Sequence, residues 1–252
     1  WAVYGEMTYD ISEKLHWTAG LRYTDETKRN DPIAYNVQGY ATTPSLSQLI
    51  ADGVQPFIPR GYRELEFDEV TWRTTLAYDL FDDVSLYATV SKGFKSGGFD
   101  QRHTAPRENP ATYEPETLVQ YELGMKADLS DTLRVNIAAF FSEYEDMHVS
   151  ANPPDDIGTV TVNAAEGEIK GVELEFTYVP VPELLIEGSL GFQDAEYTEL
   201  DPDLIVEVTE QDDFIRTPEI SWNLAASYII ELDNGSRITP RMDWIYKSEI
   251  QY

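Results

Sequence analysis

Apolar and polar residues alternate with a period of two along most of the chain, which is the pattern of β-strands with one apolar face. The clearest run extends from Val119 to Leu129, where every second residue is apolar and the residues between are polar or glycine. A run from Leu133 to Phe141 repeats the design. Weaker or shorter runs cover 1–11, 15–23, 70–80, 84–90, 172–178, 186–192, 220–230 and 238–246. By this template the sequence predicts about ten strands.

The connections between these runs alternate between short and long. Short, turn-rich connections lie at 11–15, 80–84, 129–133, 180–184 and 232–236, and the last contains Asp233-Asn234-Gly235, a strong hairpin signal. Longer polar loops lie near 27–64, 99–116, 149–158 and 197–217. Tight turns on one rim and long loops on the other are typical of outer-membrane barrels.

Alternation alone fits a soluble β-sandwich as well as a membrane barrel, because both bury one face of each strand. Strand length separates them. The run Val119–Leu129 would extend about 33 Å, or about 24 Å upright at a 45° tilt, and the apolar band of an outer-membrane barrel is about 25 Å tall. Aromatic residues also fall on the apolar face, many near strand ends, where a membrane barrel carries its girdles. They are Trp17, Tyr23, Trp72, Tyr78, Tyr178, Trp222, Tyr228, Trp244 and Tyr246.

Composition narrows the function classes. The 252 residues include no cysteine, which excludes disulfides and cysteine-based metal sites. No apolar stretch is long enough for a transmembrane helix. The net charge of −28, from 46 acids against 18 bases, argues against nucleic-acid binding, which needs a basic surface. A solvated acidic surface explains that charge as well as a ligand-related role does.

The sequence contains no recognisable catalytic constellation, so we expect no enzyme, no cofactor and no metal centre. His16, His103 and His148 are too scattered for a metal-binding spacing. The glycines of GFKSGGF (93–99) lack the spacing of a phosphate loop. Loop aspartates, such as Asp155 and Asp156, fit solvated acids better than a Ca²⁺ loop. Polar residues of the strands should face a barrel lumen, namely Glu122, Lys126, Asp128, Arg134, Asn136 and Arg241.

Ligand contacts are expected in the long loops. Arg102, His103, Arg107 and Tyr113 cluster in one of them and form the least acidic exposed patch of the sequence. They are the candidate contacts for an anionic ligand.

Several segments, in order, resemble one family. FDEVTWRTTLAYDLFDDVSLYATVSKGFKSGGFD (67–100) and YEPETLVQYELGMKADL (113–129) are similar to the middle of the barrel of TonB-dependent receptors. RVNIAAFFSEYEDMHV (134–149) and NAAEGEIKGVELEFTYVP (163–180) follow in the family's order, and LRYTDETK (21–28) fits an earlier strand. The resemblance covers nearly the whole chain.

The resemblance implies an outer-membrane receptor with a 22-stranded, antiparallel, up-and-down β-barrel around an N-terminal plug domain. Such receptors import scarce nutrients, often ferric siderophores and sometimes cobalamin, haem or saccharides, using an inner-membrane TonB energy-transducing complex. We expect residues 1–252 to form part of this barrel domain, with the leader, the plug and the last strands outside the segment. A passive porin-like channel and a soluble all-β binding protein are the alternatives.

Overall fold

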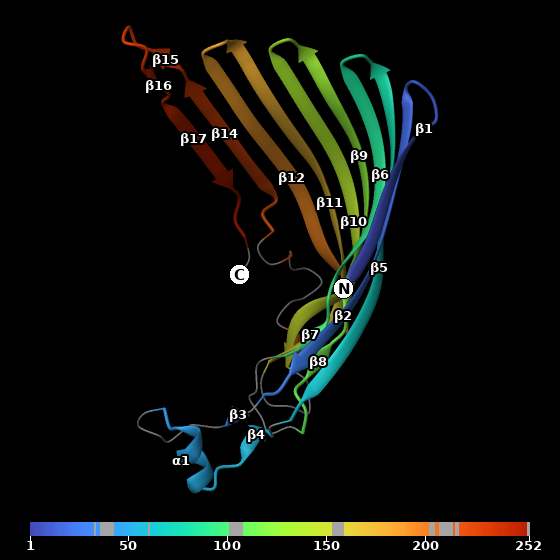
Figure 1. The fold of residues 1–252 in the computed structure, drawn as a ribbon, viewed down its shortest axis with the longest axis vertical. Coiled ribbons are helices and arrows are strands. Elements are labelled where there is room, and N and C mark those ends of the chain that lie inside the picture. Colours follow the sequence, from blue (N-terminus) through green and yellow to red (C-terminus); the bar gives the residue numbers. More distant parts are fainter. Residues whose placement is uncertain are drawn as a thin grey trace.

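The computed structural model describes residues 1–32, 34–35, 43–59, 61–100, 108–152, 159–201, 205–206, 214 and 217–250. They form one curved antiparallel sheet in which each long strand pairs with the next long strand along the chain (Figure 1). In order across the sheet these strands are β1 (Ala2–Asp10), β2 (Leu15–Asn30), β5 (Arg63–Phe81), β6 (Val84–Lys95), β9 (Glu116–Ser130), β10 (Leu133–Asn152), β11 (Val160–Val181), β12 (Leu184–Leu200), β14 (Ile220–Tyr228) and β17 (Arg241–Lys247).

The two ends of the sheet differ as the sequence predicts. Tight turns join β1 to β2, β5 to β6, β9 to β10 and β11 to β12 at one end, which we call the turn rim (Figure 1). The opposite end, the loop rim, carries the small elements of the long connections. These are β3 (Ala34–Tyr35), α1 (Leu46–Ala51), β4 (Pro56–Ile58), β7 (Gly98–Phe99), β8 (Thr112–Tyr113) and β13 (Ile205–Val206). The sheet is an open wall, because within the described chain β1 pairs only with β2 and β17 only with β14.

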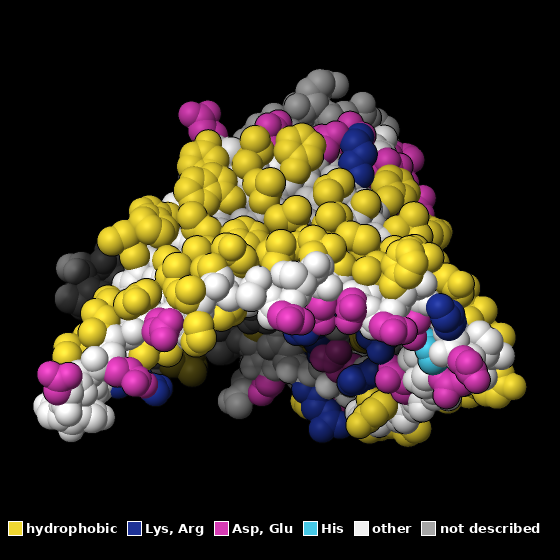
Figure 2. Space-filling model, turned by 90° about the horizontal axis from the view of Figure 1, so that it is seen from above, with side chains coloured by type: hydrophobic (Ala, Val, Ile, Leu, Met, Phe, Trp, Pro, Cys, Tyr) yellow, Lys and Arg dark blue, Asp and Glu magenta, His cyan; other side chains and the backbone are white. Residues whose placement is uncertain are grey.

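The convex face of the wall is apolar (Figure 2). The strand register aligns one uninterrupted apolar row across it, in which each residue lies directly opposite the next. The row consists of Tyr9, Trp17, Leu76, Ala88, Leu123, Ala139, Val172, Phe192 and Ile220. Large apolar side chains on this face are open to the surroundings, and Leu123 is 66% exposed. A soluble protein would not leave such a surface uncovered.

An aromatic pair and charges mark where this apolar belt ends toward the loop rim. The rings of Tyr121 and Phe141 stack 6.3 Å apart, one outward row nearer the loop rim than Leu123 and Ala139. In the same row on β11 the outward residue is Lys170, two positions before Val172, and its Nζ lies 3.0 Å from an Asp194 oxygen. The outward surface therefore changes from apolar to charged within one strand, as expected where a barrel leaves the lipid.

All of the predicted strands are present, and several are longer than predicted. β10 continues into the predicted loop near 149–158, and β2 and β5 into the predicted loop 27–64, while β11 begins at Val160, well before the predicted run 172–178. Beyond the apolar belt, apolar and polar residues no longer alternate, although the backbone hydrogen bonds between the strands continue. The sequence pattern therefore does not indicate these parts of the strands. At the turn rim β17 begins at Arg241, just after Pro240, which has no N–H to donate to a ladder. Residues before it form a small hairpin of β15 (Ile230–Glu231) and β16 (Arg237–Ile238).

Among the described residues, no helix combines the length and apolar character that would let it span a membrane.

Candidate functional site

The concave face of the wall, here called the inner wall, is polar. Its residues alternate with those of the apolar row, and all six residues expected to face a lumen lie on it: Glu122, Lys126, Asp128, Arg134, Asn136 and Arg241. Lys126 lies directly opposite Asn136, and Asp128 directly opposite Arg134. Tyr87 covers Gly124, because a Cβ at Gly124 would overlap the Tyr87 ring. Its hydroxyl donates a hydrogen bond of 2.7 Å to Glu122.

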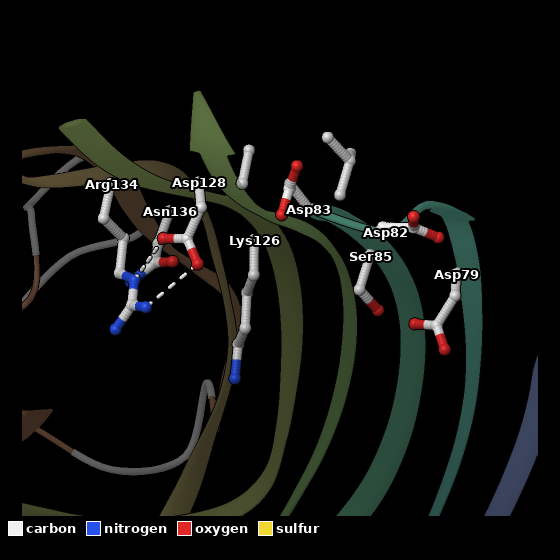
Figure 3. A pocket seen from close by; sticks show the side chains of 10 residues that line it. Asp79, Asp82, Asp83, Ser85, Lys126, Asp128, Arg134 and Asn136 are labelled. Atoms are coloured by element: carbon white, nitrogen blue, oxygen red, sulfur yellow. Dashed lines mark hydrogen bonds and ion pairs between the residues drawn. The ribbon is translucent and has the colours of Figure 1, made fainter. Parts of the chain in front are cut away.

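A polar hollow of about 410 Å³ opens on the inner wall at the turn rim (Figure 3). Arg134 donates to both oxygens of Asp128, at 2.6 and 3.0 Å, as a two-pronged ion pair. Lys126 extends along the hollow, and it forms no ion pair with any residue that the structure describes. The other polar side chains that line the hollow are Asp79, Asp82, Asp83, Ser85 and Asn136.

Two further carboxylates stand on the inner wall. Glu173 lies opposite Ala138 and Glu175 opposite Asn136, so both project from β11 to the concave side. Both are exposed, and neither forms an ion pair within the described part of the chain. These acids and Lys126 are charges that remain open to a partner occupying the lumen.

At the loop rim a short segment crosses the inner wall. This segment, the inner strap, comprises residues 97–100 and 111–114, in which β7 pairs with β8. Lys28 donates a 2.6 Å hydrogen bond to the Gly97 carbonyl. The Asp100 side chain is buried and accepts a hydrogen bond from the Thr161 backbone N–H of β11. The strap is thus attached to strands on both sides of it.

His148 fastens the other half of the strap. Its side chain is only 5% exposed, its Nε2 lies 2.7 Å from the Glu114 carbonyl, and its ring meets that of Tyr113 edge-on at 4.7 Å. Asn163 also binds Glu114, accepting from its N–H at 2.7 Å and donating to its carbonyl at 2.9 Å. A bulge in β10 with Asp146 at φ 55° precedes His148. Bulges of this kind redirect side chains.

A second contact at the loop rim joins the start of β5 to the long connection between β7 and β8. Arg63 donates to the Asn109 side chain at 2.9 Å and to the Glu108 carbonyl at 2.8 Å. Beside it, the hydrogen bond from the Tyr62 hydroxyl to the Glu64 carboxylate raises the pKa of Tyr62, because ionised tyrosine cannot donate it. Within the described residues, hydrogen bonds therefore tie the loops of this rim to the strands beside them.

The structure places one of the four candidate ligand contacts. Tyr113 lies in the inner strap, with its ring against Gly98 and His148, whereas Arg102, His103 and Arg107 lie outside the described residues. Sequence reasoning missed Lys28, Asp100 and Asn163, which carry the strap, because their partners are distant in the chain. His148 has a packing role in the strap. No group of three His, Asp or Glu residues in the described ranges could hold a metal ion.

Replacing Gly97 by alanine is expected to dislodge the strap. An added Cβ would overlap the Tyr113 carbonyl oxygen and lie 2.8 Å from a ring carbon of Phe67, and such overpacking typically costs about 1–3 kcal/mol. Gly93→Ala is the matched control, because nothing lies within 4 Å of its added Cβ. The measurement is the thermal unfolding of the full-length protein in detergent; equal unfolding temperatures for the two variants would contradict the tight fit.

Comparison with known proteins gives a family match over nearly the whole chain. The model of a family described as "TonB dependent receptor-like, beta-barrel" matches residues 1–251. The pesticin receptor of Yersinia enterocolitica is 23% identical over 175 residues, which are 69% of this chain and 23% of that receptor. The ferric-pyoverdine 358 receptor of Pseudomonas putida is 31% identical over 128 residues, 49% of this chain and 15% of that receptor.

Among solved structures, the ferric yersiniabactin uptake receptor of Yersinia pestis superposes with a TM-score of 0.73 at 18% identity, covering 96% of this chain and 33% of that one. This likeness confirms the fold. The chain therefore spans less than a quarter of the curated relatives named here and a third of the solved receptor. These proteins are named as receptors, not as enzymes, in agreement with the sequence.

Proposed function

The chain belongs to the TonB-dependent receptor β-barrel family, whose members lie in the outer membrane, and on this premise we propose that it is part of a receptor for the energised uptake of a scarce nutrient. The observation that carries the proposal is the family match over residues 1–251. The structure agrees with it, because the wall has an apolar outer belt and a polar inner face. A wall of this kind separates lipid from a polar lumen.

For the nutrient we propose a ferric siderophore or a similar iron complex. Two of the named relatives support this choice, one for ferric pyoverdine and one for ferric yersiniabactin. We also propose that Arg102, His103, Arg107 and Tyr113 contact the ligand, since cationic and aromatic groups suit an anionic chelate. Tyr113 would contribute its exposed edge, because the ring is only partly buried in the strap.

For the rest of the receptor we propose further barrel strands, a plug domain inside the barrel and an energy-transducing TonB partner in the inner membrane. The length of the relatives supports this, because the aligned segment is 23% of the pesticin receptor. The open carboxylates of the inner wall, Glu173 and Glu175, suit a basic surface of such a plug.

The test is iron uptake by cells that carry the full-length gene or its deletion. With ferric pyoverdine and ferric yersiniabactin as probes, we expect the deletion to remove uptake of one of the two complexes. In cells that carry the gene, a protonophore or loss of the TonB complex should remove uptake of the same complex. Replacing Arg102 and Arg107 by alanine should weaken binding of that complex to whole cells. Uptake that survives energy depletion would instead identify a passive channel.

A further inference from the structure

Four threonines form one row across the inner wall on its β1–β6 side. Thr8 lies directly opposite Thr18, Thr18 opposite Thr75, and Thr75 opposite Thr89, so the row crosses β1, β2, β5 and β6. The hydroxyls of Thr8 and Thr18 are 3.0 Å apart, and those of Thr75 and Thr89 are 2.9 Å apart. We call this row the threonine strip; it is a neutral surface of small groups that both donate and accept hydrogen bonds.

The threonine strip lies in a recess. The recess has a volume of about 500 Å³, and Thr18, Thr75 and Thr89 line it together with other small residues, Ala77, Ser85 and Ser91. Larger polar residues of β6 and β9 complete the lining, namely Tyr87, Gln120 and Glu122. On its loop-rim side is Arg73, whose charge is matched by Glu6 at 2.7 Å. On its turn-rim side is Lys126. The small side chains between these two cations leave the wall hollow.

The other half of the inner wall differs in charge and in bulk. In the row that contains the threonine strip, the next positions on β9 and β10 are Glu122 and Phe140. Phe140 fills the space above Gly171, where an added Cβ would lie 2.7 Å from its ring. Glu173 and Glu175 follow on β11. On β10 and β11 the wall therefore combines two open carboxylates with a ring packed over the backbone, which suits a firmly seated partner.

We propose that the threonine strip lines the route by which the polar solute crosses the barrel, while the β10–β12 part of the inner wall seats the plug. The proposal rests on the proposed function. A transport route needs contacts that are strong enough to admit a solute and weak enough to release it. Neutral hydroxyls can exchange hydrogen bonds with water and solute at little net cost, whereas the two open carboxylates of β11 would repel an anionic chelate.

The test uses single thiols in the full-length receptor. This segment contains no cysteine, so Thr75→Cys places one reactive group in the recess. Ser189→Cys is the matched control: Ser189 lies on the inner wall opposite Glu175 and is likewise half-buried. Each variant, with any cysteine elsewhere in the receptor replaced, is treated with a water-soluble maleimide in the resting state. The labelling rate, the affinity for ferric pyoverdine or ferric yersiniabactin, and the initial iron uptake are then measured.

We expect Thr75→Cys to be labelled faster than Ser189→Cys, because the recess stays open beside the seated plug. Its adduct should remove most of the initial uptake rate and leave the affinity unchanged, relative to the same unlabelled variant. Labelling of Thr75→Cys that is slower than or equal to that of Ser189→Cys would overturn the proposal, as would full uptake by its adduct. If the unmodified receptor accumulates neither complex, the proposed nutrient is wrong, and the labelling rates still show whether the recess stays open beside the plug.

Discussion

Replacing Ala139 by arginine is expected to lower the free energy of unfolding by about 2–4 kcal/mol, the range for a cationic residue on the lipid face near the bilayer midplane. Ala139 lies on the outward apolar row, directly between Leu123 and Val172. An arginine there would place a guanidinium in hydrocarbon, where it finds neither water nor a carboxylate.

The neighbouring position provides the matched control. Ala138 faces the inner wall, directly opposite Glu173, so an arginine there meets a carboxylate and water and should change the free energy by less than about 1 kcal/mol. Guanidinium unfolding of the full-length receptor in lipid vesicles, together with the amount assembled in cells, gives both values. Equal effects at the two positions would mean that the faces are assigned wrongly.

Reversing the two open carboxylates of β11, Glu173→Lys with Glu175→Lys, is expected to loosen the plug of the full-length receptor. Both residues face the lumen and have no ion pair within the described wall. If basic groups of the plug neutralise them, each lost pair that is shielded from water costs about 2–5 kcal/mol. The expected result is faster proteolysis of the plug and a cell envelope more permeable to large antibiotics.

Glu143→Lys with Glu168→Lys is the control for this double change. These two acids lie directly opposite each other on the outward face of β10 and β11, beyond the apolar belt. The control makes the same change of net charge without touching the lumen, so the plug should remain protected. Similar proteolysis rates in both double variants would exclude a seat for the plug at β11.

The sequence predicted the wall well where the lipid dictates the pattern. From Val119 to Leu129 one side of the strand meets hydrocarbon and the other a polar lumen, so the period of two follows directly from the surroundings. Nearer the loop rim this constraint ends. In β11, Ala164 and Ala165 are both buried, in a small cluster with Tyr197 and Phe214, and no alternation reveals the strand.

The candidate site was less accessible to sequence reasoning. The inner strap depends on Lys28 reaching Gly97 and on Asp100 binding the Thr161 N–H, contacts that join segments far apart in the chain. The threonine strip is equally hidden, because one threonine on each of four strands forms no motif along the chain. That the four threonines are neighbours can be recognised only from the register of the strands.

Whether the outer face lies in lipid and the inner face lines a polar lumen is tested most sharply by probing the surroundings of residues 139 and 138. Nitroxide labels on Ala139→Cys and Ala138→Cys of the full-length receptor in lipid vesicles can be tested for collision with oxygen and with a water-soluble nickel complex. We expect the label at 139 to collide mainly with oxygen and the label at 138 to be shielded from lipid. A label at 139 that collides mainly with the nickel complex, or the reverse order at the two positions, would contradict this assignment of the two faces.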